Sequence, residues 1–277
     1  MNKSKIEWAL NPDGTQGYTW NPITGCLNGC EYCYARKLAN TRLRERYRTN
    51  KNLGYDGGAP RWMIESDPFY PRFWEDKLCE PVWLPSSYRR PKAKGIFACD
   101  MSDLFGIGVP EDWTQRVIDI TKACPYHRFY LLTKQPQNLI KWSPFPDNCW
   151  VGVSATDFKL SARALYVGLD RIEAKVKFLS FEPLLGDVNV MAEDFKNTGV
   201  NWVIIGQQTP VKLATMPKIG WVEDIVRASD KAGIPVFLKD NLKPLLKNKD
   251  GWTPALYVGA REPDGSNEYL KQEMPNL

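Results

Sequence analysis

Short apolar runs alternate along the chain with longer stretches in which apolar residues recur at helical spacing. The runs are rich in Val, Ile and aromatic residues and hold few polar positions, which is typical of parallel strands buried on both faces. This alternation predicts an α/β protein. We expect strands at Tyr18–Trp20, Gly95–Cys99, Phe129–Leu132, Trp150–Val153, Val176–Leu179, Val200–Ile205 and Pro235–Leu238.

The stretches between the strands have the periodicity of amphipathic helices. In 34–48, Ala35, Ala39 and Leu43 are four residues apart and form one apolar stripe. Similar patterns predict helices at Pro110–Ala123, Phe158–Leu169 and Trp221–Ala232, together with Tyr34–Arg48. Gly233 follows the last of them, where a C-terminal cap is expected.

Repeated strand–helix units favour a partial or complete TIM-like barrel of six to eight βα units with parallel strands. A doubly wound open sheet is the second interpretation. Residues 49–94 lack a regular period and hold many Gly, Pro and aromatic residues, so we expect an irregular insertion there, with a small strand pair. We predict a single domain over 1–277, with a C-terminal extension at about 241–277.

The composition restricts the possible chemistry. The chain has seven cysteines but one histidine, His127, so a zinc site with two or three histidines is excluded. His127 precedes a predicted strand, where we expect a structural role. The N-terminus lacks the apolar run of a secretory signal, and no apolar run approaches the ~20 residues of a membrane helix. We therefore expect a cytoplasmic protein with reduced thiols and no membrane partner.

Three cysteines lie within eight residues of one Gly-containing loop: Cys26, Cys30 and Cys33, spaced C-x₃-C-x₂-C after the first predicted strand. Three thiolates at this spacing favour a [4Fe–4S] cluster that leaves one iron open. Two other interpretations stay open: a thioredoxin-like pair of Cys30 and Cys33, and a zinc site with a distant fourth cysteine. Ordinary buried thiols are a third. The remaining cysteines are expected to be small buried hydrophobes: Cys79, Cys99, Cys124 and Cys149.

The cysteine spacing, with Tyr32 just before the last cysteine, resembles the signature of the radical S-adenosylmethionine (SAM) superfamily. Residues 5–240 resemble more closely a phage-associated radical-SAM-like family of mostly unknown function. The loop between the first two cysteines is shorter than is usual in that family, and Gly206-Gln207-Gln208 stands where the family has a Gly-Gly-Glu-Ser run. The matching motifs are Ile6-Glu7-Trp8, Thr19–Cys26, Met101–Phe105, Leu131–Lys134, Trp150–Ser154 and Ser180–Gly186.

The resemblance implies that Cys26, Cys30 and Cys33 hold a [4Fe–4S] cluster and that its open iron binds SAM. An electron from a flavodoxin-like or ferredoxin-like donor would cleave SAM into methionine and a 5′-deoxyadenosyl radical, which abstracts hydrogen from the substrate. The carboxyl ends of parallel strands meet at one edge of a sheet, so we expect the residues after each strand to lie together. The resemblance places these residues at the cofactor: Tyr32, Ser102, Asp103, Lys134, Ser154, Glu182 and Gly206.

Individual roles follow from the same resemblance. Asp103, supported by Ser102, is expected to bind the amino group of SAM, although either residue also suits a helix N-cap. Lys134 is expected to pair with the SAM carboxylate or with a substrate anion, and a plain surface lysine is the alternative. Ser154 is expected at the ribose, Glu182 at the ribose or the substrate, and Gly206 against adenine. Four residues are predicted on the substrate side: Gln207, Gln208, Lys239 and Asp240.

Basic residues suggest the substrate. The net charge is +5, and Lys and Arg gather at 36–51, 89–94 and 239–249 with aromatic residues between them. Basic patches with stacking rings are typical of nucleic-acid binding. Together with the phage association of the resembled family, this predicts modification or rearrangement of a DNA base, an isomerase-type or transferase-type reaction in the host cytoplasm. The alternatives are a radical enzyme for a small metabolite or peptide, and a non-catalytic iron–sulfur or zinc-binding interaction protein.

Overall fold

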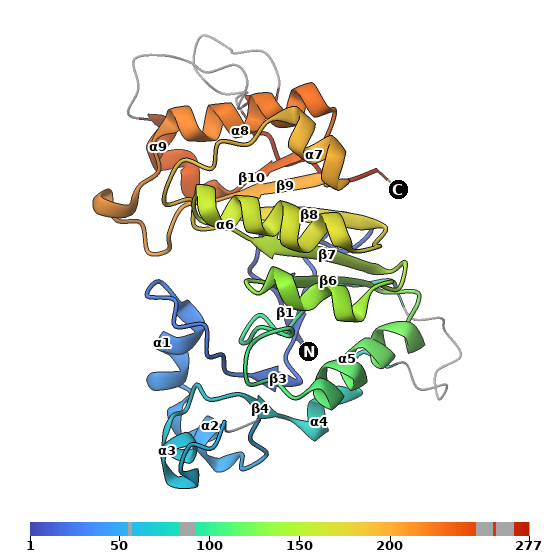
Figure 1. The fold of residues 1–277 in the computed structure, drawn as a ribbon, viewed down its shortest axis with the longest axis vertical. Helices are drawn as coiled ribbons and strands as arrows, with labels where there is room; N and C mark the ends of the chain where they lie inside the picture. Colours follow the sequence, from blue (N-terminus) through green and yellow to red (C-terminus); the bar gives the residue numbers. More distant parts are fainter. Residues whose placement is uncertain (55–56, 83–91, 248–256, 259–268, 277) are drawn as a thin grey trace. The chain divides into compact units, whose positions relative to one another are not determined.

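The computed structural model describes residues 1–54, 57–82, 92–247, 257–258 and 269–276 (Figure 1). The chain folds into two compact units. The first unit is Met1–Val151 with Glu173–Lys175, and the second unit is Gly152–Ile172 with Val176–Leu277. The single domain expected from the sequence remains a prediction.

Four strands of the first unit lie side by side in the order β1, β2, β5, β6. They span Asn2–Lys3, Tyr18–Trp20, Gly95–Ala98 and Arg128–Thr133. The pair β1–β2 is antiparallel, and the pairs β2–β5 and β5–β6 are parallel, with Tyr18 opposite Ile96 and Gly95 opposite Arg128. Every residue of β5 is buried, as the continuous apolar run predicts.

A second, smaller antiparallel pair joins β3 (Ile23–Thr24) to β4 (Arg72–Phe73). The sequence predicted a strand pair within 49–94, but β4 is the only strand among the described residues of that stretch, and its partner comes from the segment just after β2. Short helices surround this pair: α1 (Tyr34–Asn40), α2 (Arg44–Thr49), α3 (Arg61–Ser66) and α4 (Glu75–Leu78). The longer helix α5 (Glu111–Ala123) buries Trp113, Val117 and Ile118, and a 3₁₀-helix, η1, spans Pro136–Trp142.

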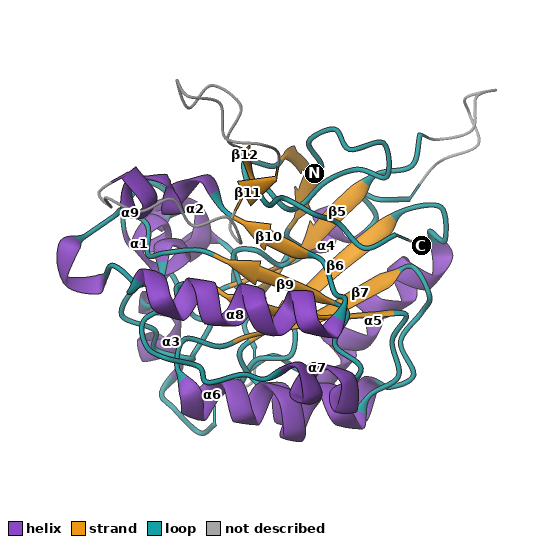
Figure 2. Ribbon diagram, turned by 90° about the horizontal axis from the view of Figure 1, so that it is seen from above, coloured by secondary structure: helices purple, strands orange, loops and turns teal. Residues whose placement is uncertain are grey.

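In the second unit the strands β8 (Val176–Phe181), β9 (Trp202–Ile205) and β10 (Val236–Leu238) are parallel neighbours in that order. Strand β7 (Cys149–Ser154), buried throughout, begins in the first unit and ends in the second. Figure 2 shows the helices of this unit as purple ribbons: α6 (Phe158–Arg163), α7 (Ala192–Thr198), α8 (Ile219–Ala232) and α9 (Lys243–Lys247).

Several short segments complete the second unit. Helix α6 continues as a π-turn, η2 (Ala164–Gly168), and a 3₁₀ turn, η3 (Leu169–Arg171). Two further 3₁₀ turns are η4 (Leu213–Thr215) and η5 (Asp240–Leu242), and an antiparallel pair joins β11 (Tyr257–Val258) to β12 (Tyr269–Leu270). Gly233 ends α8 with a φ of 73°, which confirms the predicted left-handed cap.

The α/β class and the mostly parallel strands are confirmed, and each predicted strand is present with ends shifted by a few residues. Closure into a barrel remains a prediction. The single helix predicted over 34–48 is wrong: the backbone leaves the helix at Thr41 and restarts at Arg44, because the apolar stripe alone cannot show a local break. Helix α7 and strand β1 were not predicted.

Two predictions about single residues have opposite outcomes. His127 is buried, and its Nδ1 accepts a hydrogen bond from the backbone N–H of Lys94 at 3.1 Å, so its structural role is confirmed. Cys79 is exposed and not a buried hydrophobe, whereas Cys99, Cys124 and Cys149 are buried as expected.

None of the helices in the described part of the chain has the length and apolar character needed to cross a membrane.

Candidate functional site

The three cysteines lie on the loop between β3 and α1. Cys33 is the N-cap of α1, and its Sγ accepts a hydrogen bond from the backbone N–H of Arg36 at 3.4 Å. The Sγ of Cys26 accepts one from the N–H of Asn28 at the same distance. Cys26, Cys30 and Cys33 are free thiols and half-buried. Backbone N–H groups aimed at sulfur are typical of thiolate ligands of iron–sulfur clusters.

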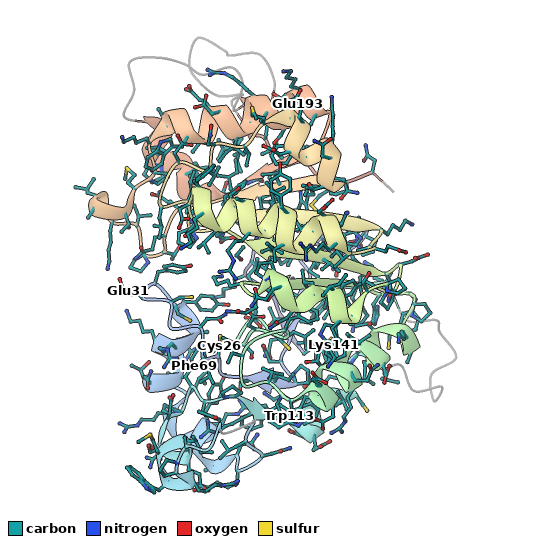
Figure 3. The ribbon with its side chains drawn as sticks, in the orientation of Figure 1. Cys26, Glu31, Phe69, Trp113, Lys141 and Glu193 are labelled. Atoms are coloured by element: carbon teal, nitrogen blue, oxygen red, sulfur yellow. The ribbon has the colours of Figure 1, made fainter. Side chains whose placement is uncertain are left out.

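The start of this loop is tightly held. The N–H of Cys26 donates to the carbonyl oxygen of Phe69 at 2.9 Å, and Figure 3 shows the two residues close together. The guanidinium of Arg36 donates to the carbonyl oxygen of Cys26 at 2.9 Å. Gly25 has a φ of 86°, and a Cβ atom there would overlap the carbonyl oxygen of Tyr70, so this position requires glycine.

Asp103 connects the cysteine loop to the end of β6. Its Oδ1 accepts hydrogen bonds from the N–H of Phe105 at 3.1 Å and from the hydroxyl of Thr133 at 2.7 Å. Its Oδ2 accepts from the side-chain amide of Asn28 at 3.0 Å and from the N–H of Lys134 at 2.9 Å. The residue is 5% exposed, and these four donors provide the partners that a buried charge needs. Asp103 therefore positions the loop that carries Cys26.

The alternative role of this segment as a helix cap is wrong. The next helix along the chain is α5, whose N-cap is Pro110. Ser102 instead donates its hydroxyl hydrogen to the carbonyl oxygen of Gly25, at the start of the cysteine loop. Ser102 and Asp103 thus both hold the cysteine loop, and the expected contact of either residue with SAM remains a prediction.

Burial raises the pKa of the Cys26 thiol to about 12. The negative charge of Asp103 adds to this shift, and smaller contributions come from Cys30 and Cys33. In the metal-free protein Cys26 is therefore a protonated thiol at pH 7. A metal ion or cluster that binds here has to displace this proton.

The donor set of the loop suits an iron–sulfur cluster. Three free thiols are available, and three cysteines are what a cluster with an open iron requires. Among the residues that the structure describes, no three Cys, His, Asp or Glu side chains are grouped as metal ligands. Cluster binding would therefore have to draw Cys26, Cys30 and Cys33 together.

Side-chain amides that the sequence did not single out extend from Asp103. Asn28, which donates to Asp103, accepts a hydrogen bond from the side-chain amide of Gln135. Gln135 in turn accepts from the amide of Gln137 at 2.6 Å. Each of these side-chain amides thus donates its hydrogen bond in the direction of the Asp103 carboxylate. The charge of that carboxylate polarises the chain of hydrogen bonds. The only signal for these residues in the sequence is their position beside Cys26 and Lys134.

Asp100 is a second carboxylate missed by sequence reasoning. Burial raises its pKa, and its Oδ1 accepts a hydrogen bond from the side-chain amide of Asn21 at 2.5 Å. The hydroxyl of Tyr34, at the start of α1, donates to the Asp100 carbonyl oxygen at 2.7 Å. Tyr32 and Lys134 are half-buried, and their expected roles at the cofactor remain predictions.

The second unit groups other predicted residues. Glu182 follows β8 and Lys239 follows β10, and their side chains form a close, mostly buried ion pair. A Cβ atom at Gly206, which follows β9, would lie 2.9 Å from Cδ of Lys239 and 3.4 Å from Cγ of Glu182. Gly206 is therefore in contact with both partners. Ser154, the last residue of β7, is also buried.

Gln207 and Asn241 form hydrogen bonds with each other next to the ion pair of Glu182 and Lys239. The N–H of Gln207 donates to Oδ1 of Asn241 at 3.2 Å, and the amide of Asn241 donates to the carbonyl oxygen of Gln207 at 2.8 Å. Gln207 is 2% exposed. Asn241 was not predicted. Gln208 is half-buried, and the exposed Asp240 pairs with Lys243 at 2.8 Å, so their substrate roles remain predictions.

A family model described as "Protein of unknown function (DUF5131)" matches residues 3–246. The chain belongs to the DUF5131 family. Comparison with curated proteins found no match. A solved structure of a spore photoproduct lyase mutant resembles this DUF5131 protein with a TM-score of 0.40 and 13% identity, covering 98% of this chain and 71% of the other. A likeness this weak defines no function, so the proposal below depends on the residues of this chain.

Proposed function

We propose that this DUF5131 protein is a radical SAM enzyme that acts on nucleic acid. The observation that carries the proposal is the C-x₃-C-x₂-C loop, whose three thiols are free and half-buried and whose position is held by Asp103. When bound there, a [4Fe–4S] cluster would supply the electron that cleaves SAM into methionine and a 5′-deoxyadenosyl radical. An external flavodoxin-like or ferredoxin-like protein would supply that electron.

The residues of the chain have separable tasks in this proposal. Cys26, Cys30 and Cys33 ligate iron. Asp103 keeps the loop against the end of β6, and its charge near the site favours a cationic group such as the sulfonium or amino group of SAM. Burial around Cys26 limits the access of water, which protects a reactive radical from side reactions.

In the second unit, the group around Glu182 and Lys239 supports binding of polar parts of a ligand. By the resemblance to radical SAM proteins, Ser154 is proposed at the ribose, Glu182 at the ribose or the substrate, and Gly206 at adenine. Lys239, Gln207, Gln208 and Asp240 are proposed on the substrate side. The charges of Glu182 and Lys239 compensate each other. This group would therefore select a ligand by the positions of its hydrogen-bond donors and acceptors more than by its net charge.

The proposal is tested by anaerobic reconstitution of the full chain with iron and sulfide, followed by reduction in the presence of SAM. Each of the variants Cys26→Ala, Cys30→Ala and Cys33→Ala should lose the bound iron and sulfide and stop forming 5′-deoxyadenosine. Cys79→Ala is the matched control, because Cys79 is an exposed thiol outside the loop and should leave both readouts unchanged.

Two results would contradict the proposal. Continued cleavage of SAM by Cys30→Ala would show that this cysteine is not a ligand. A wild-type protein that binds zinc tightly but neither holds a cluster nor cleaves SAM would indicate a zinc-binding interaction protein instead.

A further inference from the structure

The positive charge of the protein is concentrated in one part of the first unit. Residues 36–67 contain eight Lys or Arg against four Asp or Glu, whereas the whole chain has a net charge of +5. This segment includes α1, α2 and α3, which lie near one another in the views of Figures 1 and 2. The charge of the chain therefore belongs mainly to this small group of helices. The predicted basic stretches at 89–94 and 239–249 lie partly outside the described residues.

Several of these cations are available to a ligand. Arg42, Arg44 and Arg46 are exposed, and none of the three has a carboxylate within salt-bridge distance in the described part of the chain. Lys51 and Arg61 share one carboxylate, that of Glu65, at 3.0 and 2.8 Å. Because two cations share one anion, the positive charge at α2 and α3 is only partly compensated.

An exposed aromatic ring follows one of these cations, Arg61, in the chain. This ring, Trp62 on α3, is 70% exposed, and its neighbour Met63 is 49% exposed. Other tryptophans of this chain, such as Trp8 and Trp20, are buried, whereas the ring of Trp62 offers its face to a ligand. An exposed ring beside cations is the arrangement on which proteins stack the bases of single-stranded nucleic acids.

A buried arginine, Arg72, fixes the ends of α2 and α3 in the absence of a ligand. Arg72 is 1% exposed, and its guanidinium donates to four backbone carbonyl oxygens. Two of them, of Asn50 and Glu65, belong to the ends of α2 and α3, and the other two belong to Asp67 and Tyr70. One side chain thus fixes the ends of both helices, so little ordering would be needed when a ligand binds.

Helices α1 and α2 are packed against the cysteine loop. Ala35, Ala39 and Tyr47 of α1 and α2 form a buried cluster with Phe69 and Met101. Cys26 and Cys33 pack against this cluster. A strand held at α2 and α3 would therefore lie near the proposed site of radical formation, within the same unit.

We propose that the surface formed by Arg42, Arg44, Arg46, Lys51, Arg61 and Trp62, the α2–α3 surface, holds single-stranded nucleic acid. The arginines contact phosphates, and Trp62 stacks on one base. This inference rests on the proposed function and names the surface that holds its substrate. The exposed ring favours nucleic acid over an acidic peptide, because a base offers a flat face to Trp62 and a carboxylate side chain does not.

The test measures binding of a fluorescein-labelled 16-nucleotide single strand to the full-length, cluster-free protein by anisotropy at 50 and 200 mM salt. Trp62→Ala should weaken binding by about 10-fold, the effect of losing one stacked base. Arg42→Glu combined with Arg44→Glu should weaken it further and lower the slope of log affinity against log salt by at least about 1.4.

The second unit offers matched controls. Phe158, which is 57% exposed, is followed by the exposed Lys159, so Phe158→Ala and Lys159→Glu make the same kinds of change elsewhere on the surface. Both should bind the strand like the wild type. Affinity unchanged in Trp62→Ala would overturn the stacking role. Competition by polyglutamate as effective as competition by the unlabelled strand would overturn nucleic acid in favour of an acidic protein partner.

Failure of this inference and failure of the proposed function are distinguishable. Trp62→Ala should hold its cluster and cleave SAM normally when no nucleic acid is present. Cys30→Ala should bind the labelled strand normally but lose SAM cleavage. A protein that cleaves SAM yet binds no strand overturns the α2–α3 surface and leaves the cysteine site standing.

Discussion

The two units each hold a buried carboxylate just after a parallel strand, but they neutralise it differently. Asp103 in the first unit is held by uncharged donors: two backbone N–H groups, a hydroxyl and a side-chain amide. Glu182 in the second unit forms an ion pair with Lys239. Uncharged donors stabilise a carboxylate without cancelling its charge, whereas a lysine cancels it.

This difference indicates two kinds of task. Burial raises the pKa of the Cys26 thiol, and the charge of Asp103 adds to that shift. Such a site attracts cations and holds a loop in place. The pair of Glu182 and Lys239 has no net charge and is suited to neutral, hydrogen-bonding ligand groups. The following predictions test this contrast.

The largest effect is expected for Asp103→Asn. The new amide nitrogen would replace either Oδ1 or Oδ2, and each of these oxygens accepts two hydrogen bonds. At least one backbone N–H, that of Phe105 or that of Lys134, would therefore lose its acceptor, and the charge that strengthens all four hydrogen bonds would disappear. We expect a loss of about 3 kcal/mol in the free energy of unfolding. Urea unfolding measures it.

Asp157→Asn is the control for Asp103→Asn. Asp157 caps α6 by accepting the N–H of Leu160 at 3.0 Å, and asparagine caps helices equally well, so almost no change is expected. Equal stability of the two variants would show that Asp103 does not depend on its charge.

A smaller loss, about 2 kcal/mol, is expected for Lys239→Met, which leaves the mostly buried Glu182 without this lysine. Adding Glu182→Gln should restore most of the stability, because the remaining charge is removed as well. The double-mutant cycle in urea gives the coupling energy. Additive effects of the two substitutions would mean that the ion pair contributes nothing. Lys159→Met, at an exposed lysine, controls for the loss of a cation alone.

A pH effect of about 1 kcal/mol between pH 6.5 and 5.5 is expected from the single histidine. Burial lowers the pKa of His127 to about 4, so between pH 6.5 and 4 the unfolded chain binds a proton that the folded chain does not. The contribution is absent above pH 6.5, and stability falls as the pH is lowered from there toward 4. His127→Gln should unfold with a weaker pH dependence in this range. An unchanged pH dependence would exclude His127 as the cause.

The smallest effect, below about 1 kcal/mol, is expected for Gly206→Ala. The added methyl group would meet the flexible chain of Lys239, which can shift at small cost. The shift also moves the lysine nitrogen. The free energy of SAM binding should therefore fall by more than the free energy of unfolding does. Calorimetric titration of the reconstituted protein compares the two. An unchanged affinity would place Gly206 outside the binding site.

The strands were predictable because their residues are buried on both faces and apolar throughout. Local geometry was not: the helix predicted over 34–48 breaks at Thr41, and Cys99 leaves its predicted strand with a φ of 61°. The strand pair of the insertion also differs, since β4 pairs with residues 23–24 far away in the chain. Such pairings depend on long-range contacts that periodicity does not record.

For the candidate site, the sequence alone determined the three cysteines, because their spacing within one loop is itself the chemical signal. It also indicated Asp103, Glu182, Gly206 and Lys239, because each follows a strand. Only the tertiary structure decided what these side chains contact: Asp103 holds Asn28 and the end of β6, and Glu182 pairs with Lys239, 57 residues away. Spacing along the chain identifies ligands that lie within one loop. The partners of a buried charge, in contrast, belong to segments that become neighbours only in the folded protein.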